Sequence, residues 1–91
     1  MSKLRKLAAG RECRIRLPGV CNFDNATTVL AHFRLIGYSG MGVKIPDHIG
    51  AWACSACHAY VDSHKDAETQ LAFALGVFRT QATLITEREI K

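Results

Sequence analysis

The stretch "GAWACSACHAYVDSH", residues 50 to 64, contains two cysteines in a CxxC arrangement and a histidine directly after the second cysteine. A CxxC pair supplies two thiolates from one tight turn, commonly at the point where a loop enters a helix. We therefore predict that Cys54 and Cys57 form half of a metal site. We also predict that a short helix begins at Ser55.

The other two cysteines, Cys13 and Cys21, are separated by seven residues, which is wider than the usual ligand spacing in zinc sites. The intervening "RLPGV" consists of turn-forming residues that can bring the two thiols back together. Four thiolates suit a tetrahedral zinc ion, so we predict a structural Zn²⁺ held by Cys13, Cys21, Cys54 and Cys57. Buried free cysteines and disulfides are the alternatives.

The chain has 91 residues, of which 48% are hydrophobic and 22% are charged. It contains no repeat, low-complexity segment or linker, so we predict a single domain over residues 1–91. A domain of this size removes only roughly 60 to 65% of its unfolded surface from water, so a metal would help to stabilise it.

The apolar runs are too short to span a bilayer, and the start of the chain lacks the apolar core of a signal peptide. We therefore expect a cytoplasmic protein without a membrane segment. In that reducing compartment the four thiols would stay available to a metal.

The net charge of +4 is unevenly distributed. Residues 1–12 form a basic arm, and its positive charge suits the phosphates of a nucleic acid. A solvated basic tail is the alternative. Together with two cations further along the chain, the arm gives the predicted nucleic-acid-binding residues: Lys3, Arg5, Lys6, Arg34 and Lys44.

Residues 13 to 34 have the pattern of two β-strands. "CRIRL" (13–17) alternates polar and apolar side chains, and "TTVLAHFR" (27–34) is rich in β-branched and apolar residues. The turn residues of "PGVCNFDN" lie between them. Residues 35 to 49 contain three glycines and a proline, which predicts an ordered loop.

A long helix is predicted over "DAETQLAFALGVFRTQATL" (66–84), with Asp66 as its N-cap. Helical periodicity predicts that one apolar face of this helix belongs to the core. Gly76 interrupts the helix at a cost of about 1 kcal/mol relative to alanine, and close packing against the zinc-bound loop is a possible reason. The residues of the predicted core face are Leu71, Ala74, Leu75, Phe78 and Ala82.

Two histidines are candidates for a second site. His58 and Asp62 are four residues apart, so on a helix they share one face and could hold a hard divalent cation. His64 would point about 120° away from His58 on a continuous helix, and we predict a surface histidine there. His32, in "LAHFR", is typical of a core histidine, but the predicted hairpin would bring it beside the helix that carries His58.

These residues resemble a known family. A hairpin bearing a histidine, a loop, and then a CxxCH sequence that opens a helix look like the HNH endonucleases, whose ββα-metal motif is a treble-clef zinc fold. The likeness over nearly the whole chain is to small prophage-encoded nucleases of the YbcO type, and it is carried by "LPGVCN", "LAHFR", "GAWACSACH" and "FRT". The resemblance implies an α+β fold: a small zinc-stapled treble-clef domain with a β-hairpin and C-terminal helices.

The resemblance also implies roles for individual residues. The first histidine of the family, the general base, falls on His32, and the last, a ligand of the catalytic metal, falls on His58. The family often has Asp where this chain has Ala31, and Asp62 could replace it as a metal ligand. The Asn that orients the base has no counterpart; "PDHIG" offers Asp47 or His48, and we choose Asp47 because a carboxylate can accept a ring N–H.

The function that we expect is therefore a metal-dependent DNA endonuclease of phage or prophage origin, with low sequence specificity and a conceivable role in recombination. Its cofactors would be a structural Zn²⁺ and a catalytic Mg²⁺, Mn²⁺ or Zn²⁺. The alternative is a zinc-stabilised module that binds nucleic acid or protein and cuts nothing. A thiol redox protein is disfavoured, because no βαβ pattern surrounds the CxxC pair. The sequence leaves the oligomeric state open.

Overall fold

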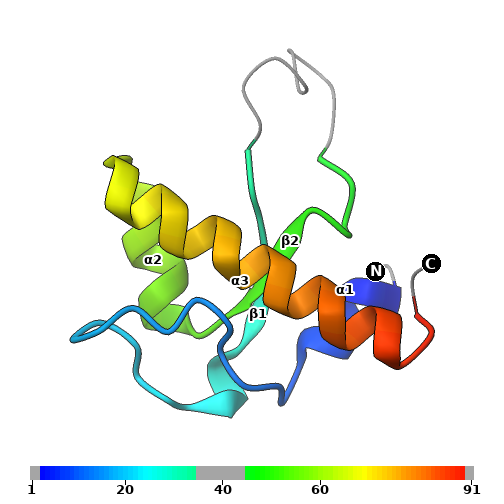
Figure 1. Ribbon diagram of the computed structural model, residues 1–91. Helices are drawn as coiled ribbons and strands as arrows, with labels where there is room; N and C mark the ends of the chain where they lie inside the picture. Colours follow the sequence, from blue (N-terminus) through cyan, green and yellow to red (C-terminus); the bar gives the residue numbers. More distant parts are fainter. Residues whose placement is uncertain (1–2, 35–44, 90–91) are drawn as a thin grey trace.

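The computed structural model describes residues 3–34 and 45–89. It confirms a small α+β domain in which two antiparallel strands are followed by helices. Figure 1 shows helix α3 lying across the two-stranded sheet, with α2 beside the first part of α3. The elements in chain order are α1 (Lys3–Ala8), the 3-10 turn η1 (Asn25–Thr27), β1 (Val29–His32), β2 (Gly50–Ala53), α2 (Ser55–Ser63) and α3 (Ala67–Thr86).

The sheet pairs β1 with β2 so that Val29 lies opposite Ala53 and His32 lies opposite Gly50. Every residue of β2 is buried, and three of its four residues are glycine or alanine. Small side chains allow the helix to approach the strand closely, and α3 packs mainly on β2. His32 thus lies at the end of a strand whose partner is fixed against α3.

The predicted strand over residues 13–17 is wrong. The partner of β1 is β2, and the segment around Arg14 makes a single backbone bond to β2, from the Arg14 N–H to the Trp52 carbonyl at 2.7 Å. Arg16 has a φ of 53°, which ends the extended run before a strand can form. On the same edge of β2, the N–H of Trp52 donates to the Thr80 hydroxyl at 3.0 Å.

Both predicted helix starts are confirmed. The Cys54 sulfur caps α2 by accepting the N–H of Cys57 at 3.4 Å. Asp66 caps α3, since its carboxylate accepts the N–H of Thr69 at 3.1 Å and the Thr69 hydroxyl at 2.8 Å. These hydrogen bonds lower the pKa of Asp66, so the cap stays intact above the usual aspartate pKa and is lost as the pH falls through the lowered value.

The predicted core face of the long helix is also wrong. Leu71, Leu75, Phe78 and Ala82 are exposed, and Ala74 is only partly buried. The buried residues of α3 lie on the opposite face: Thr69, Phe73, Gly76, Val77, Thr80 and Leu84.

Gly76 explains this choice of face. A Cβ at this position would lie 2.9 Å from the Ile15 side chain and 3.2 Å from the Arg14 carbonyl oxygen. Only a glycine lets the helix approach the 13–16 segment this closely. The close packing against the loop that carries Cys13, which the sequence suggested, is confirmed.

The remainder of the core surrounds Trp52. This side chain is fully buried with Ala8 and Leu84, so α1 packs on the domain as part of its core and is no free basic arm. The Arg11 guanidinium lies 4.7 Å from the Trp52 ring centroid and donates two hydrogen bonds to Glu87, at 2.6 and 2.9 Å. The bonds from Arg11 lower the pKa of Glu87.

No helix in the described part of the chain combines the length and the apolar character needed to cross a lipid bilayer.

We predict that Gly76→Ala destabilises the domain although alanine is the better helix former. The added methyl must displace the backbone near Arg14, and overpacking of this kind costs about 1 to 3 kcal/mol, which exceeds the gain of about 1 kcal/mol in helix propensity. Urea unfolding of the zinc-loaded protein measures the change. Thr86→Ala, at an exposed position of the same helix, should stay within about 0.5 kcal/mol of wild type. Greater stability of Gly76→Ala would contradict the packing argument.

Candidate functional site

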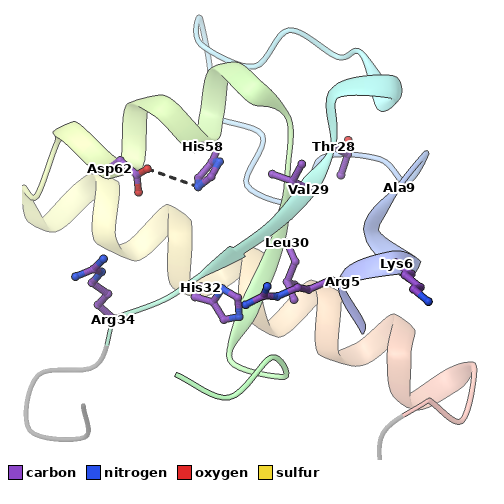
Figure 2. Close-up of a pocket in the computed structure, with 10 residues that line it drawn as sticks. All are labelled: Arg5, Lys6, Ala9, Thr28, Val29, Leu30, His32, Arg34, His58 and Asp62. Atoms are coloured by element: carbon purple, nitrogen blue, oxygen red, sulfur yellow. Dashed lines mark ion pairs between the residues drawn. The ribbon is translucent and has the colours of Figure 1, made fainter. Parts of the chain in front are cut away.

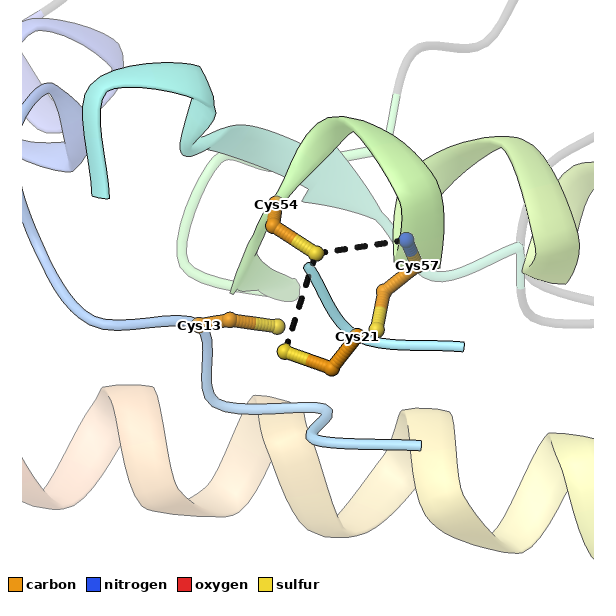
Figure 3. A group of neighbouring side chains, drawn as sticks. All are labelled: Cys13, Cys21, Cys54 and Cys57. Carbon is orange, nitrogen blue, oxygen red and sulfur yellow. Dashed lines mark hydrogen bonds between the residues drawn. The ribbon is translucent and has the colours of Figure 1, made fainter. Parts of the chain in front are cut away.

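The four cysteines come together as one cluster, in which all the sulfur atoms lie within 4.8 Å of one another. Figure 3 shows Cys54 and Cys57 on the turn that enters α2, facing Cys13 and Cys21 from the loop segments. The sulfurs of Cys21 and Cys54 are 3.8 Å apart. Tetrahedral ligation with Zn–S bonds of about 2.3 Å requires sulfur separations of roughly 3.8 Å, so the cluster fits a structural zinc ion.

Backbone N–H groups surround these sulfurs. Arg16 donates to the Cys13 sulfur at 3.5 Å and Cys57 donates to the Cys54 sulfur at 3.4 Å. Burial raises the pKa of Cys54, but the N–H groups of Cys57 and Asn22 outweigh it and lower this pKa to about 7. Burial raises the pKa of Cys57. A zinc ion would bind the thiolate forms and release these protons.

A groove runs over β1 between α1 and α2, with a volume of about 670 Å³. Figure 2 shows side chains from all three elements that line it. The polar residues of its lining include both histidines that the sequence singled out: Arg5, Lys6, Thr28, His32, Arg34, His58 and Asp62.

His32 and Asp47 form the first polar pair of this region. The Nε2 atom of His32 lies 2.7 Å from a carboxylate oxygen of Asp47, and both side chains are about one-quarter exposed. Arg5 of α1 places its Nε atom 3.6 Å from the same oxygen. Asp47 is thus held between the strand histidine and a cation from the N-terminal helix, whereas the side chain of His48 is exposed.

His58 and Asp62 form the second pair, on the face of α2 that borders the groove. Their Nε2 and Oδ2 atoms are 3.5 Å apart, and both side chains are open to solvent. Two ligand atoms that share one cation at about 2.1 Å lie roughly 3.0 to 3.5 Å apart, so the pair fits a divalent ion. His64 is exposed and stacks on Tyr60 with ring centroids 3.8 Å apart, which confirms the predicted surface histidine.

The predicted cations separate into two groups. Arg5, Lys6 and Arg34 line the groove, whereas Lys3 is paired with Glu89 at 2.9 Å. Lys44 lies outside the described residues. Lys65 was missed by the sequence analysis: it lines an adjoining hollow that shares His32, Arg34 and Asp62 with the groove. Its position two residues after the end of α2 could have indicated this, because its ammonium group folds back onto the helix end and donates to the Val61 carbonyl at 2.9 Å.

We predict that the purified protein contains one zinc ion per chain and that Cys57→Ser loses both the zinc and the fold. Zinc in sites of this kind contributes about 10 kcal/mol to folding, and a domain this small has little else to replace it. Elemental analysis measures the metal, and circular dichroism measures the fold. Ser63→Ala, on the same helix, should keep both. A folded, metal-free Cys57→Ser protein would contradict a structural zinc site.

Comparison with known proteins places the chain in a family. Residues 2–89 match the family model described as "Putative nuclease YbcO". The chain is 50% identical over 95 aligned positions to "Putative nuclease YbcO" of Escherichia coli strain K12, with 100% of this chain and 99% of that protein covered. The corresponding protein of Enterobacteria phage 82 gives the same identity and coverage.

A solved structure agrees with the fold. It is described as "Structure of a putative bacteriophage protein from Escherichia coli str. K-12 substr. MG1655" and has 42% sequence identity to this chain. The TM-score is 0.78, with 94% of this chain and 100% of the other chain covered. The chain therefore belongs to the family described as "Putative nuclease YbcO".

Proposed function

We propose that the chain is a metal-dependent DNA endonuclease of the HNH type that hydrolyses phosphodiester bonds with low sequence specificity. The family supports a nuclease. The observation that carries the finer proposal is that His32, in contact with Asp47, shares one groove with His58 and Asp62. A histidine base and a cation site flanking one groove are what metal-assisted hydrolysis of a phosphodiester requires.

In this proposal His32 is the general base. Asp47 lies at its Nε2 atom, so a neutral His32 donates the Nε2–H to that carboxylate. The Nδ1 atom is then unprotonated and can accept a proton from the attacking water. Asp47 fixes this tautomer and stabilises the imidazolium that forms, while Arg5 holds Asp47 from the other side.

His58 and Asp62 would hold the catalytic cation, Mg²⁺, Mn²⁺ or Zn²⁺. When bound there, the cation supplies neutralisation of the charge that develops on the phosphate and on the leaving oxygen. Asp62 takes the place of the Asp that the HNH family often has before the first histidine. Ala31 stands at that position here, and its side chain is buried among the core residues.

The cations of the groove would position the DNA backbone. Arg5 and Lys6 come from α1, whereas Arg34 follows the end of β1 and Lys65 follows α2, so positive charge comes to the neighbourhood of His32 from three segments. Contacts to phosphates fix the register of a duplex but carry no sequence information. Lys44 remains a predicted contact of the same kind.

A second candidate function is a zinc-stabilised module that binds nucleic acid or protein without cutting. The buried Ala31 favours it, because one ligand of the usual HNH metal site is missing. The two functions differ in whether the groove hydrolyses DNA, which the following experiment tests.

We predict that the wild-type protein cuts supercoiled DNA only with an added divalent cation, and that His32→Ala lowers the rate by about 100-fold or more, since a general base contributes 10² to 10⁴ in rate. Asp47→Asn should lower it by about 10 to 100-fold, as loss of an orienting partner does. Plasmid nicking is measured with supercoiled, linear and single-stranded DNA and with Mg²⁺, Mn²⁺ or Zn²⁺.

His48→Ala is the matched control for this experiment. It removes an exposed histidine next to Asp47 that is not among the groove-lining residues in the described part of the chain. Its rate should equal that of wild type. If a folded, zinc-loaded wild type binds DNA but cuts none of the substrates, the module is the correct function.

We predict a second, exchangeable metal site that is lost in His58→Ala and in Asp62→Ala. Each change removes a ligand and should weaken Mn²⁺ binding by more than about tenfold, because loss of even an outer partner costs 10 to 100-fold. Titration followed by electron paramagnetic resonance measures free Mn²⁺, while elemental analysis shows that the zinc is retained. His64→Ala should bind Mn²⁺ as wild type does; equal affinity in all the variants would exclude this cation site.

A further inference from the structure

The outer face of α3 carries a continuous apolar stripe. At about 100° per residue, its members fall within an arc of roughly 80°, directly opposite the buried face of the helix. Leu71 is 60% exposed, Leu75 40%, Phe78 64% and Ile85 53%. Figure 1 shows the sheet and the other helices on the far side of α3. The outer stripe consists of Leu71, Leu75, Phe78, Ala82 and Ile85.

The spacing of the outer stripe indicates a helical partner. Its residues recur at intervals of four, three, four and three positions, which averages 3.5 residues. This repeat keeps one stripe in contact with a neighbouring helix along its whole length. Since the outer stripe runs from Leu71 to Ile85, 14 residue steps along α3, the contact would extend over about 21 Å. Contiguous exposed apolar side chains of this kind are typical of a protein contact.

The charges near the stripe argue against DNA at this face. Arg79 is the cation at the edge of the stripe within α3, and its guanidinium donates to the Arg14 carbonyl at 3.0 Å. Neighbouring positions along the edge carry uncharged side chains, among them Ala72, Ala74 and Gln81. A surface that binds a nucleic-acid backbone needs a row of cations. The uncharged residues beside the stripe are suited instead to contact with an apolar helix.

The charges at the ends of α3 favour an antiparallel copy of the same helix. Glu68 lies in the first turn. Beyond the last turn, Glu87 and Glu89 are engaged in ion pairs within the chain, so among the described residues Arg88 is the charge there outside any ion pair. An antiparallel arrangement brings the acidic end of one helix to the basic end of the other and opposes the helix dipoles. A parallel arrangement would place like ends together.

The shape of the surface agrees with this arrangement. A hollow beside the first half of α3 is lined by Leu17, Pro18, Tyr60 and Leu71, among others. Leu71 and Ile85 are each seven residues from Phe78. When two antiparallel helices cross at Phe78, Ile85 of the second copy therefore lies level with Leu71, beside this hollow.

We propose that the chain forms a homodimer in which the outer stripe of α3 pairs antiparallel with the outer stripe of a second copy. Each copy contributes the same surface, as a two-fold interface requires. The dimer carries two of the grooves described above, and its formation is independent of whether those grooves cut DNA.

The test is sedimentation velocity of the zinc-loaded protein across the micromolar range. The wild type should sediment with the mass of two chains and dissociate on dilution, whereas Phe78→Glu should be monomeric, since it places a charge at the centre of the stripe. Phe23→Glu is the matched control: Phe23 is 80% exposed on the zinc-binding loop, and its replacement should leave the dimer intact. Zinc content and circular dichroism show that each variant is folded.

The orientation is tested with a spin label on Ala67→Cys, which keeps the charge of Glu68. Antiparallel pairing about Phe78 places the two labelled positions about 33 Å apart along the axis, whereas parallel pairing places them about 10 Å apart. A wild type that is monomeric at every concentration would overturn the proposal. So would a dimer that survives Phe78→Glu, or a short distance between the labels.

Discussion

The four-sulfur cluster is the constraint on which the rest of the structure depends. It joins the loop that carries Cys13 and Cys21 to the junction between β2 and α2. Within residues 3–34 and 45–89 the sheet has two strands of four residues each, which would be marginal by itself. A zinc ion at the cluster would fix this loop, on which Ile15 packs against Gly76 and determines how close α3 comes. The positions of α2 and α3 follow from that contact.

The cluster also determines where His58 lies at the groove. Cys57 is fully buried, and His58, the next residue of α2, is half-exposed at the groove. The side chains of adjacent helical residues point about 100° apart. The same turn of α2 can therefore direct the Cys57 sulfur into the core and the His58 imidazole toward the groove. The two sites differ in chemistry as well: soft thiolates select zinc, whereas an imidazole and a carboxylate accept harder cations. Under the proposed function, a structural zinc ion and an exchangeable cation would thus have ligands one residue apart.

Local signals predicted much of this structure. The CxxC turn and the cap residue Asp66 act within a few residues, and both helices begin where these signals place them. The contact between His32 and Asp47 was suggested only by resemblance. The wrong predictions concern features that depend on residues distant in the sequence. Helix α3 has two apolar stripes, and the contact of Gly76 with Ile15 determines which of them is buried. The buried stripe was not recognised because it contains the polar Thr80. The Thr80 hydroxyl accepts a hydrogen bond from the Trp52 N–H of β2, and no local sequence pattern predicts this bond.

The link between Arg11 and Glu87 has a consequence for the order of folding. These residues are 76 positions apart. Burial of Trp52 also requires Leu84, which belongs to the same core cluster. The ligands of the sulfur cluster, in contrast, all precede residue 58. On the ribosome, the half of the domain that carries these cysteines can therefore assemble while α3 is still being made. The second core cluster must wait until Leu84 has emerged, and such long-range contacts form slowly. Until then Trp52 lacks its cover, which makes the nascent chain vulnerable to aggregation at this point.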